Sequence, residues 1–169
     1  STFGRDLKAP MIHVHRTTLA NGLRVLVTPL THLQGASVCV YIKVGSRYEE
    51  VSTNGLSHFL EHMLFRGTEA HPTSYDFNLA AERIGGSLEA ATYADFTEYG
   101  LSLPRECVAE GIQVLSGMFR TPRFTEIELE KQVVREEILA DLDEDGREID
   151  ADNLALRLMF DEDPLGFKI

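Results

Sequence analysis

Cysteine is scarce in this sequence, with Cys39 and Cys107 far apart in a chain of 169 residues. Two cysteines do not make the disulfide framework on which small secreted domains depend. The compartment therefore stays open, and a reducing one is favoured. We expect Cys39, inside an apolar strand pattern, to be a small core residue.

Long apolar runs and export signals are also missing. No hydrophobic segment approaches the roughly 20 residues of a membrane helix, which excludes a membrane span. The first residues, Ser1 to Asp6, fit neither a secretion signal nor a transit peptide rich in Arg and Ser. The first residue is not methionine, from which we expect that a segment has been removed.

Basic residues are outnumbered, 16 against 27 acidic ones, and the net charge is −11. This balance argues against nucleic acid or an anionic membrane as a partner and favours basic ligands. The hydrophobic content of 43% and the charged content of 25% are typical of a soluble globular chain of one domain.

The hydrophobic pattern predicts an α+β sandwich with helices packed on one face of a sheet. A hairpin is expected around Asn21-Gly22, which is a strong hairpin signal. The strands are expected at 13–18, 23–28, 36–45, 87–93 and 96–103. The helices are expected at 54–65, 75–84, 105–119, 125–143 and 149–160, with Asn54 and Thr125 as N-caps.

The first of these helices carries the sequence His58-Phe59-Leu60-Glu61-His62. His58 and His62 are four residues apart, so they project from the same side of a helix and can hold one metal ion. Glu61 faces the same cleft, where it can act on a metal-bound water. Two histidines and a glutamate also occur on solvated helix surfaces, but apolar residues interleave with these three. His-x-x-Glu-His is the inverse of the commoner zinc protease motif.

A hydrolytic zinc site needs a third protein ligand. The helix expected at 125–143 offers Glu130 and Glu137, which are seven residues apart and share a face beside apolar residues. Carboxylates along a partly buried stripe are costly unless they are paired or bound to a metal. A charged outer helix face remains the alternative.

Several segments together resemble the pitrilysin/insulinase family of zinc metallopeptidases, the inverzincins. Its small bacterial zinc proteases and mitochondrial processing peptidase β subunits are the most similar branches. The resemblance rests on the following segments and residues: Ala20-Asn21-Gly22-Leu23, Gly45-Ser46-Arg47-Tyr48-Glu49, Gly55 to Thr68, Ile84-Gly85-Gly86, Ala90, Thr92, Thr97, Tyr99, Val133 to Ile138 and Pro164-Leu165-Gly166.

The resemblance implies a function: a zinc-dependent endopeptidase that hydrolyses extended or unfolded peptides. It implies His58, His62 and Glu137 as ligands of Zn2+ and Glu61 as the general base. The resemblance implies that Glu130 does not bind the metal itself but orients one of the residues that do. The implied fold is a two-layer sandwich with a mixed, mostly antiparallel sheet.

The resemblance also implies that 88–99 contains an edge strand that binds substrate by main-chain hydrogen bonds. The substrate-binding residues would be Glu89, Ala90, Ala91 and Thr92. Glu89 stands where the family commonly has asparagine. The charge favours peptides with basic residues as substrates.

Family enzymes enclose the substrate between two homologous halves or subunits. The whole chain, 1–169, corresponds to the N-terminal zinc-binding half-domain and stops before its end, so we expect a second half-domain, a partner subunit or a dimer. The expected compartment is the bacterial cytoplasm ahead of the mitochondrial matrix. One alternative is a partner subunit that binds zinc and peptide without cleavage. The other is an enzyme like S-ribosylhomocysteinase, with Cys39 or Cys107 as a ligand.

Overall fold

The computed structural model describes residues 13–161 and 163–168. The chain divides into two compact units, with the boundary between Gln34 and Gly35. Each unit is described by itself.

The first unit contains the predicted hairpin. Strand β1 (His15–Thr18) pairs antiparallel with β2 (Arg24–Val27), and His15 lies opposite Val27. The turn contains Gly22 at φ 87°, a backbone conformation that glycine adopts without strain. Both strands are shorter than their hydrophobic patterns predict.

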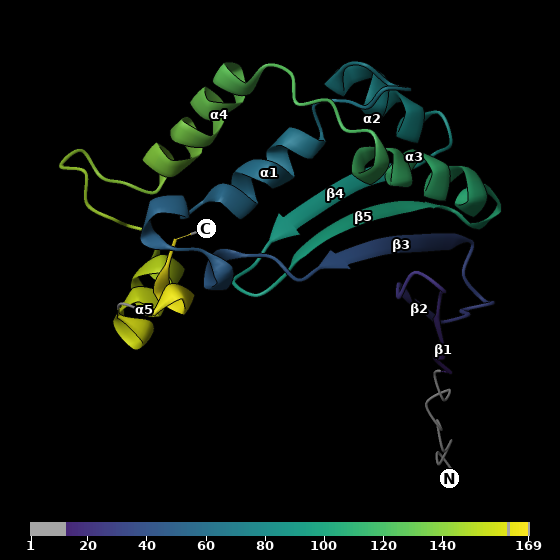
Figure 1. The fold of residues 1–169 in the computed structure, drawn as a ribbon, viewed down its shortest axis with the longest axis horizontal. Helices are drawn as coiled ribbons and strands as arrows, with labels where there is room; N and C mark the ends of the chain where they lie inside the picture. Colours follow the sequence, from purple (N-terminus) through teal and green to yellow (C-terminus); the bar gives the residue numbers. More distant parts are fainter. Residues whose placement is uncertain (1–12, 162, 169) are drawn as a thin grey trace, which may run out of the picture. The chain divides into compact units, whose positions relative to one another are not determined.

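The second unit contains a three-stranded antiparallel sheet in the order β3-β5-β4 (Figure 1). The strands are β3 (Gly35–Ile42), β4 (Ser87–Thr92) and β5 (Thr97–Pro104). Strand β5 is central, so β4 lies at an edge of this sheet. The fold class predicted from the sequence is confirmed, and the strand pairs described are all antiparallel.

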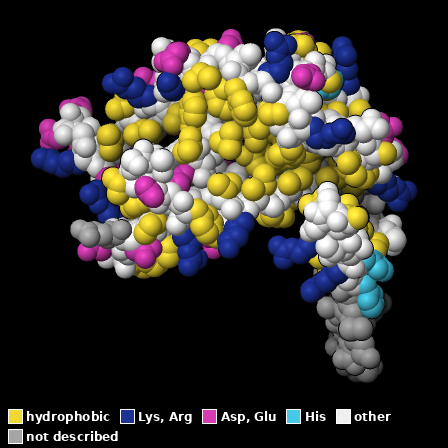
Figure 2. Space-filling model, viewed as in Figure 1, with side chains coloured by type: hydrophobic (Ala, Val, Ile, Leu, Met, Phe, Trp, Pro, Cys, Tyr) yellow, Lys and Arg dark blue, Asp and Glu magenta, His cyan; other side chains and the backbone are white. Residues whose placement is uncertain are grey.

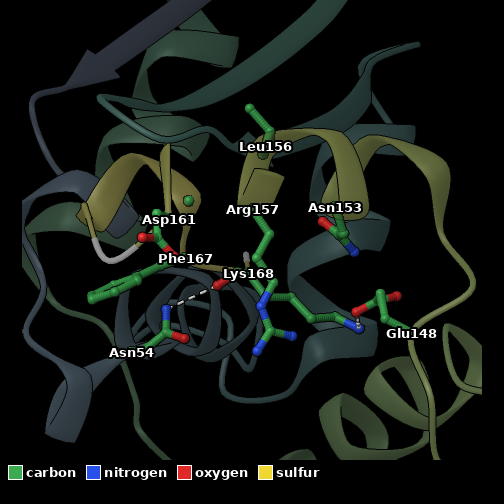
Figure 3. A pocket seen from close by; sticks show the side chains of 9 residues that line it. Asn54, Glu148, Asn153, Leu156, Arg157, Asp161, Phe167 and Lys168 are labelled. Carbon is green, nitrogen blue, oxygen red and sulfur yellow. Dashed lines mark hydrogen bonds and ion pairs between the residues drawn. The ribbon is translucent and has the colours of Figure 1, made fainter. Parts of the chain in front are cut away.

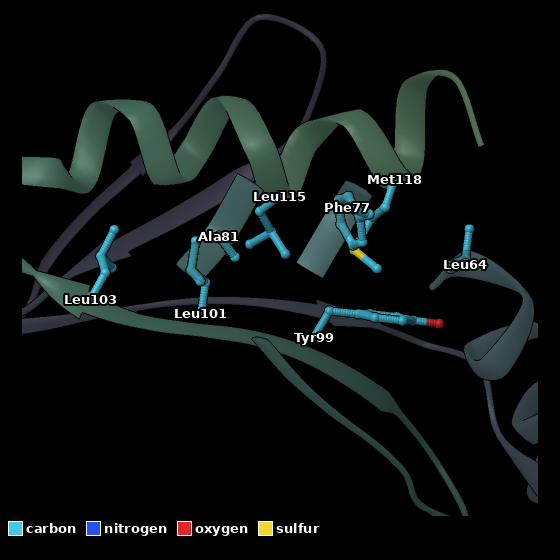
Figure 4. Packing of buried hydrophobic residues seen from close by; sticks show 8 residues of the cluster. All are labelled: Leu64, Phe77, Ala81, Tyr99, Leu101, Leu103, Leu115 and Met118. Carbon is cyan, nitrogen blue, oxygen red and sulfur yellow. The ribbon is translucent and has the colours of Figure 1, made fainter. Parts of the chain in front are cut away.

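Helices α2 and α3 cover one face of this sheet (Figure 1). The core lies between them and β5, where Leu101 and Leu115 are almost fully buried (Figure 4). Tyr99 also packs edge-on against Phe119. Helix α1 contacts both β4 and α4. The helices are α1 (Leu56–Leu64), α2 (Ser74–Glu82), α3 (Val108–Arg120), α4 (Ile127–Ala140) and α5 (Ala151–Phe160), with short 3-10 helices η1 (Ser46–Tyr48), η2 (Val51–Thr53), η3 (Arg105–Cys107) and η4 (Pro164–Gly166).

The side chains that β3 directs to the opposite face of the sheet are exposed, which corrects the prediction for Cys39. Side chains alternate along a strand, and β3 places Cys39 with Ser37 and Tyr41 on the exposed face. Its neighbours Val38 and Val40 pack against the core instead. A continuous apolar run does not reveal which face each residue occupies.

Two predicted helix caps are also wrong. Asn54 does not cap α1, because Gly55 occupies the N-cap position in the left-handed conformation. Thr125 does not cap α4, whose N-cap is Glu126 at φ 58° without a side-chain cap. Both helices therefore begin later than predicted. Among the residues described, no helix is long and apolar enough to span a membrane.

Candidate metal centre

The start of α1 is held by the carboxylate of Glu49. Its Oε2 accepts a hydrogen bond from the Gly55 N–H at 2.7 Å, and its Oε1 accepts one from the Ser57 N–H at 2.6 Å. These donors belong to the first turn of the helix, where backbone N–H groups have no partner within the helix. Glu49 therefore replaces the N-cap side chain and fixes where α1 begins, two residues before His58.

The same contacts perturb the ionisation of Glu49. Burial by itself would raise its pKa, but the hydrogen bonds from Ser57, Gly55 and Asn54 outweigh burial and lower the pKa below its ordinary value of 4.5. The carboxylate is therefore charged at neutral pH, as its position at a helix N-terminus favours.

Three side chains from α1 and α4 gather their donor atoms in one place. His58 and His62 are one turn apart, and their Nε2 atoms are 3.1 Å from each other. Glu137 Oε2 lies 3.4 Å from His62 Nε2 and 3.9 Å from His58 Nε2. Among the described residues, these three form the group with suitable spacing for a metal ion.

The donor set fits zinc. Zinc with ligand bonds of about 2.0–2.1 Å in a tetrahedron separates its donor atoms by about 3.3 Å. The three separations in this cluster, 3.1, 3.4 and 3.9 Å, lie near that value. Two imidazoles and one carboxylate are also donor types that zinc accepts. Three protein donors leave a fourth position free for water or substrate.

The protonation of His58 suits metal binding. Burial lowers its pKa, and the neighbouring His62 lowers it further, against the opposing effect of Glu61, Glu137 and Glu49. The neutral imidazole is the form that binds a metal.

Glu130 supports His62 from the far side of the ring. Its Oε1 lies 2.9 Å from His62 Nδ1, which fixes the ring so that Nε2 faces the other donors. Glu130 is only 5% exposed and needs a cation nearby. Arg66 supplies it, with Nε 2.8 Å from Glu130 Oε2, although the two groups are not aligned for a hydrogen bond.

Glu61 lies on α1 beside β4. Thr92 Oγ1 donates a hydrogen bond to Glu61 Oε2 at 2.5 Å. Burial raises the pKa of the Tyr99 hydroxyl, and the negative charge of Glu61 adds to the effect. The carboxylate of Glu61 is therefore close to the core as well as to His58.

Strand β4 presents the predicted substrate-binding residues on alternating faces. Ala90 lies on the face that the helices cover, where it packs against the core. The Glu89 side chain lies on the opposite face, over Gly100 of β5. A Cβ at Gly100 would overlap the Glu89 side chain, so the glycine makes room for it. Ala91 lies opposite Glu98 in the register.

The sequence placed the three donors, Glu61 and Glu130 correctly on α1 and α4, but it missed Glu49 and Arg66. Arg66 could have been found from the cost of burying Glu130, which requires a cation. Glu49 belongs to a segment that resembles the family, but its contact with the start of α1 was not predicted, because it is not adjacent to α1 in sequence. The cluster contains no cysteine, and Cys39 is exposed on β3, so the alternative with a cysteine ligand gains no support.

A cavity of about 330 Å³ lies apart from this cluster and is lined by residues of α5 and the C-terminal segment (Figure 3). Lys168 reaches across it to Glu148 at 3.1 Å and also pairs with Asp141 at 2.9 Å. None of the three donors lines it. Beside this cavity the side-chain amide of Asn54 donates a hydrogen bond to the Lys168 carbonyl oxygen at 2.9 Å. This bond connects the C-terminal segment to the residue before Gly55.

The fold and the donor cluster together define the class of zinc peptidases with an inverted His-x-x-Glu-His motif. The chain belongs to the insulinase family of peptidases, peptidase family M16, whose model matches residues 24–166. This confirms the resemblance noted in the sequence.

Relatives and a solved structure agree with this family. The β subunit of the mitochondrial processing peptidase of Dictyostelium discoideum is 37% identical over 75% of this chain and 26% of its own length. An uncharacterized zinc protease of Mycobacterium leprae is 38% identical over 90% of this chain and 34% of its own. The crystal structure of a protease from Helicobacter pylori matches with a TM-score of 0.78 and 27% identity, over 92% of this chain and 38% of that one. The chain therefore spans about a quarter to a third of these two relatives.

Proposed function

We propose that this chain is the zinc-binding half-domain of a metalloendopeptidase that hydrolyses extended or unfolded peptides. The observation that carries the proposal is the convergence of His58, His62 and Glu137 from two helices. Glu61 lies on the same helix as the two histidines, and its charge acts on His58. Membership of the family and the naming of relatives as zinc proteases support the same reading.

His58, His62 and Glu137 would hold the zinc ion, and Glu130 would keep His62 oriented. Bound zinc supplies Lewis-acid chemistry, which makes water more acidic and a carbonyl more electrophilic.

Glu61 is the general base in this proposal. Its Oε2 is engaged by Thr92, and no hydrogen bond to Oε1 occurs among the residues that the structure describes. Oε1 is therefore the atom available to take a proton from the attacking water and to pass it to the leaving amine.

The peptide would bind along β4. This strand is at the edge of the three-stranded sheet, so its outer backbone groups can pair with an extended peptide. The alternation along β4 would place Ala90 and Thr92 toward the helices and Glu89 and Ala91 away from them. The net charge of −11 favours peptides with basic residues.

A second homologous half-domain or subunit would complete the chamber, either in the same polypeptide, in a partner or in a dimer. Helix α4 exposes large apolar side chains, and hydrophobic groups gather on the face shown in Figure 2. Such exposure is typical of a surface that another domain covers. The exposed apolar residues of α4 are Ile127, Leu129, Val133, Ile138 and Leu139.

The test compares Glu61→Gln with the unchanged sequence in the complete natural polypeptide. Zinc content should stay the same, because Glu61 is not among the three donors, while hydrolysis of a fluorogenic unfolded peptide should be lost. Glu69→Gln, which changes an exposed carboxylate just beyond α1, is the matched control and should keep turnover. Retained turnover in Glu61→Gln would contradict the role of the base.

The same assay distinguishes the proposed peptidase from the alternative, a partner subunit without catalytic activity. If the unchanged polypeptide binds zinc and peptide but never hydrolyses the peptide, even with its second half present, the non-catalytic reading replaces the peptidase.

A further inference from the structure

The hydrogen bond between Thr92 and Glu61 joins the proposed base to the proposed substrate strand. Thr92 is the last residue of β4, and Glu61 lies on α1. The separation of 2.5 Å from Thr92 Oγ1 to Glu61 Oε2 is typical of a hydroxyl that donates to an ionised carboxylate. Such a bond is about twice as strong as one between neutral groups.

A second threonine fixes the direction in which the Thr92 hydroxyl points. Thr97 is fully buried and lies directly opposite Thr92 in the β4–β5 register. Its Oγ1 donates its one hydrogen to the carbonyl oxygen of Val44 at 3.1 Å and shares that hydrogen with Thr92 Oγ1 in a longer contact of 3.4 Å. Thr92 therefore has its own hydroxyl hydrogen free for Glu61.

This arrangement does more than satisfy a partly buried hydroxyl. A glutamate side chain has three rotatable bonds, and a carboxylate held at one oxygen presents the other oxygen in a fixed place. The cross-strand threonine pair sits on the rigid sheet, which makes it a better anchor than a loop.

We propose that Thr92 is a positioning residue that holds the Glu61 carboxylate and leaves Oε1 as the atom for proton transfer. The inference rests on the proposed function of Glu61. In this proposal the side chain of Thr92 holds the Glu61 carboxylate, while its backbone remains part of the strand proposed to bind peptide. A peptide that pairs with β4 would then be aligned with the base through a single residue.

The test replaces Thr92 by valine, which keeps the shape and removes the hydroxyl, and by serine, which keeps the hydroxyl. In the complete natural polypeptide loaded with zinc, Thr92→Val should lower kcat by about 10- to 100-fold, as misplacement of a reacting group does. KM and zinc affinity should stay within about twofold, because neither the strand backbone nor the three donors change. Thr92→Ser should recover most of kcat.

Crystal structures of the two zinc-loaded variants give a readout apart from activity. The Glu61 carboxylate should keep its hydrogen bond to residue 92 in Thr92→Ser and should rotate or occupy two orientations in Thr92→Val. An unchanged carboxylate in Thr92→Val would overturn the inference. Thr18→Val makes the same change on an exposed strand and should alter none of these quantities.

Two further results decide between explanations. Thr92→Ala should have the same kcat as Thr92→Val. If both variants instead lose zinc and have a lowered Tm, the role of Thr92 is merely structural and the inference is overturned. Equal losses in Thr92→Val and Thr92→Ser would overturn it too. If Thr92→Val keeps full turnover while Glu61→Gln loses it, the positioning role fails and the peptidase stands; if Glu61→Gln keeps turnover, the proposed function itself fails.

Discussion

Replacing Glu130 by glutamine removes a charge from the most deeply buried carboxylate at the candidate metal centre. Glu130 is 5% exposed, with its Oε1 2.9 Å from His62 Nδ1 and its Oε2 2.8 Å from Arg66 Nε. The glutamine has nearly the same shape, so the change tests the charge and its hydrogen bond to His62.

Two costs follow from the structure. Loss of a carboxylate that orients a ligating histidine lowers metal affinity by about 10- to 100-fold. That range corresponds to about 1.4–2.7 kcal/mol of zinc binding. The second cost is a loss of folding stability. Arg66 loses its nearest counter-charge, and among the described residues it then keeps an ion pair with Glu126 alone, whose Oε2 lies 3.5 Å from Arg66.

The assay is zinc competition against a chromophoric chelator, combined with thermal unfolding. Glu128→Gln is the matched control: it lies on the same helix, is exposed, and pairs with Lys131 at 2.7 Å, so zinc affinity should not change. The double variant Glu130→Gln/Arg66→Met removes the unpaired cation, so it should recover stability but not zinc affinity. Zinc affinity of Glu130→Gln within twofold of the unchanged protein would refute the reasoning.

Two further predictions concern stability. The pKa of Glu49 is lower in the folded protein than in the unfolded chain. The hydrogen bonds that its charged carboxylate accepts from Gly55 and Ser57 therefore stabilise the protein above about pH 4.5, and this stabilisation is lost as the pH falls through the pKa of the folded state. Glu49→Gln should therefore lower the free energy of unfolding by about 1 kcal/mol at pH 6, with the difference shrinking as the pH falls below 4.5 in denaturant titrations of the metal-free protein; a constant difference would contradict this. Gly45→Ala should cost about 2 kcal/mol or more, because a Cβ would overlap the carbonyl oxygen of Tyr93, while Gly35→Ala, with room for a Cβ, should stay within about 0.5 kcal/mol.

Hydrophobic periodicity predicted the order and type of the elements well where an element buries one face, as β3, β5, α1 and α3 do. It failed on details that tertiary contacts decide. Cys39 was expected in the core because the run from Val38 to Val40 is apolar throughout, and only the pairing of β3 with β5 shows that Cys39 faces outward. Asn54 was expected to cap α1, but Glu49 takes that role from outside the helix.

The candidate site was predictable to the extent that it follows from helix geometry. Spacing alone put His58 with His62 and Glu130 with Glu137, and the structure brings the two pairs together. The role of the Thr92 side chain was not predictable, because the hydrogen bond to Glu61 depends on how α1 packs against β4.

The central claim is the zinc site of two histidines and one glutamate, and its most direct test is the zinc content of the purified protein beside Glu137→Gln. We expect about one zinc per chain in the unchanged protein, and loss or marked weakening of zinc binding in the variant, since a Glu137 carboxylate oxygen is one of three donor atoms within 4.8 Å of one another. Zinc bound equally in both would contradict Glu137 as a ligand, and zinc in neither would contradict the metal centre itself.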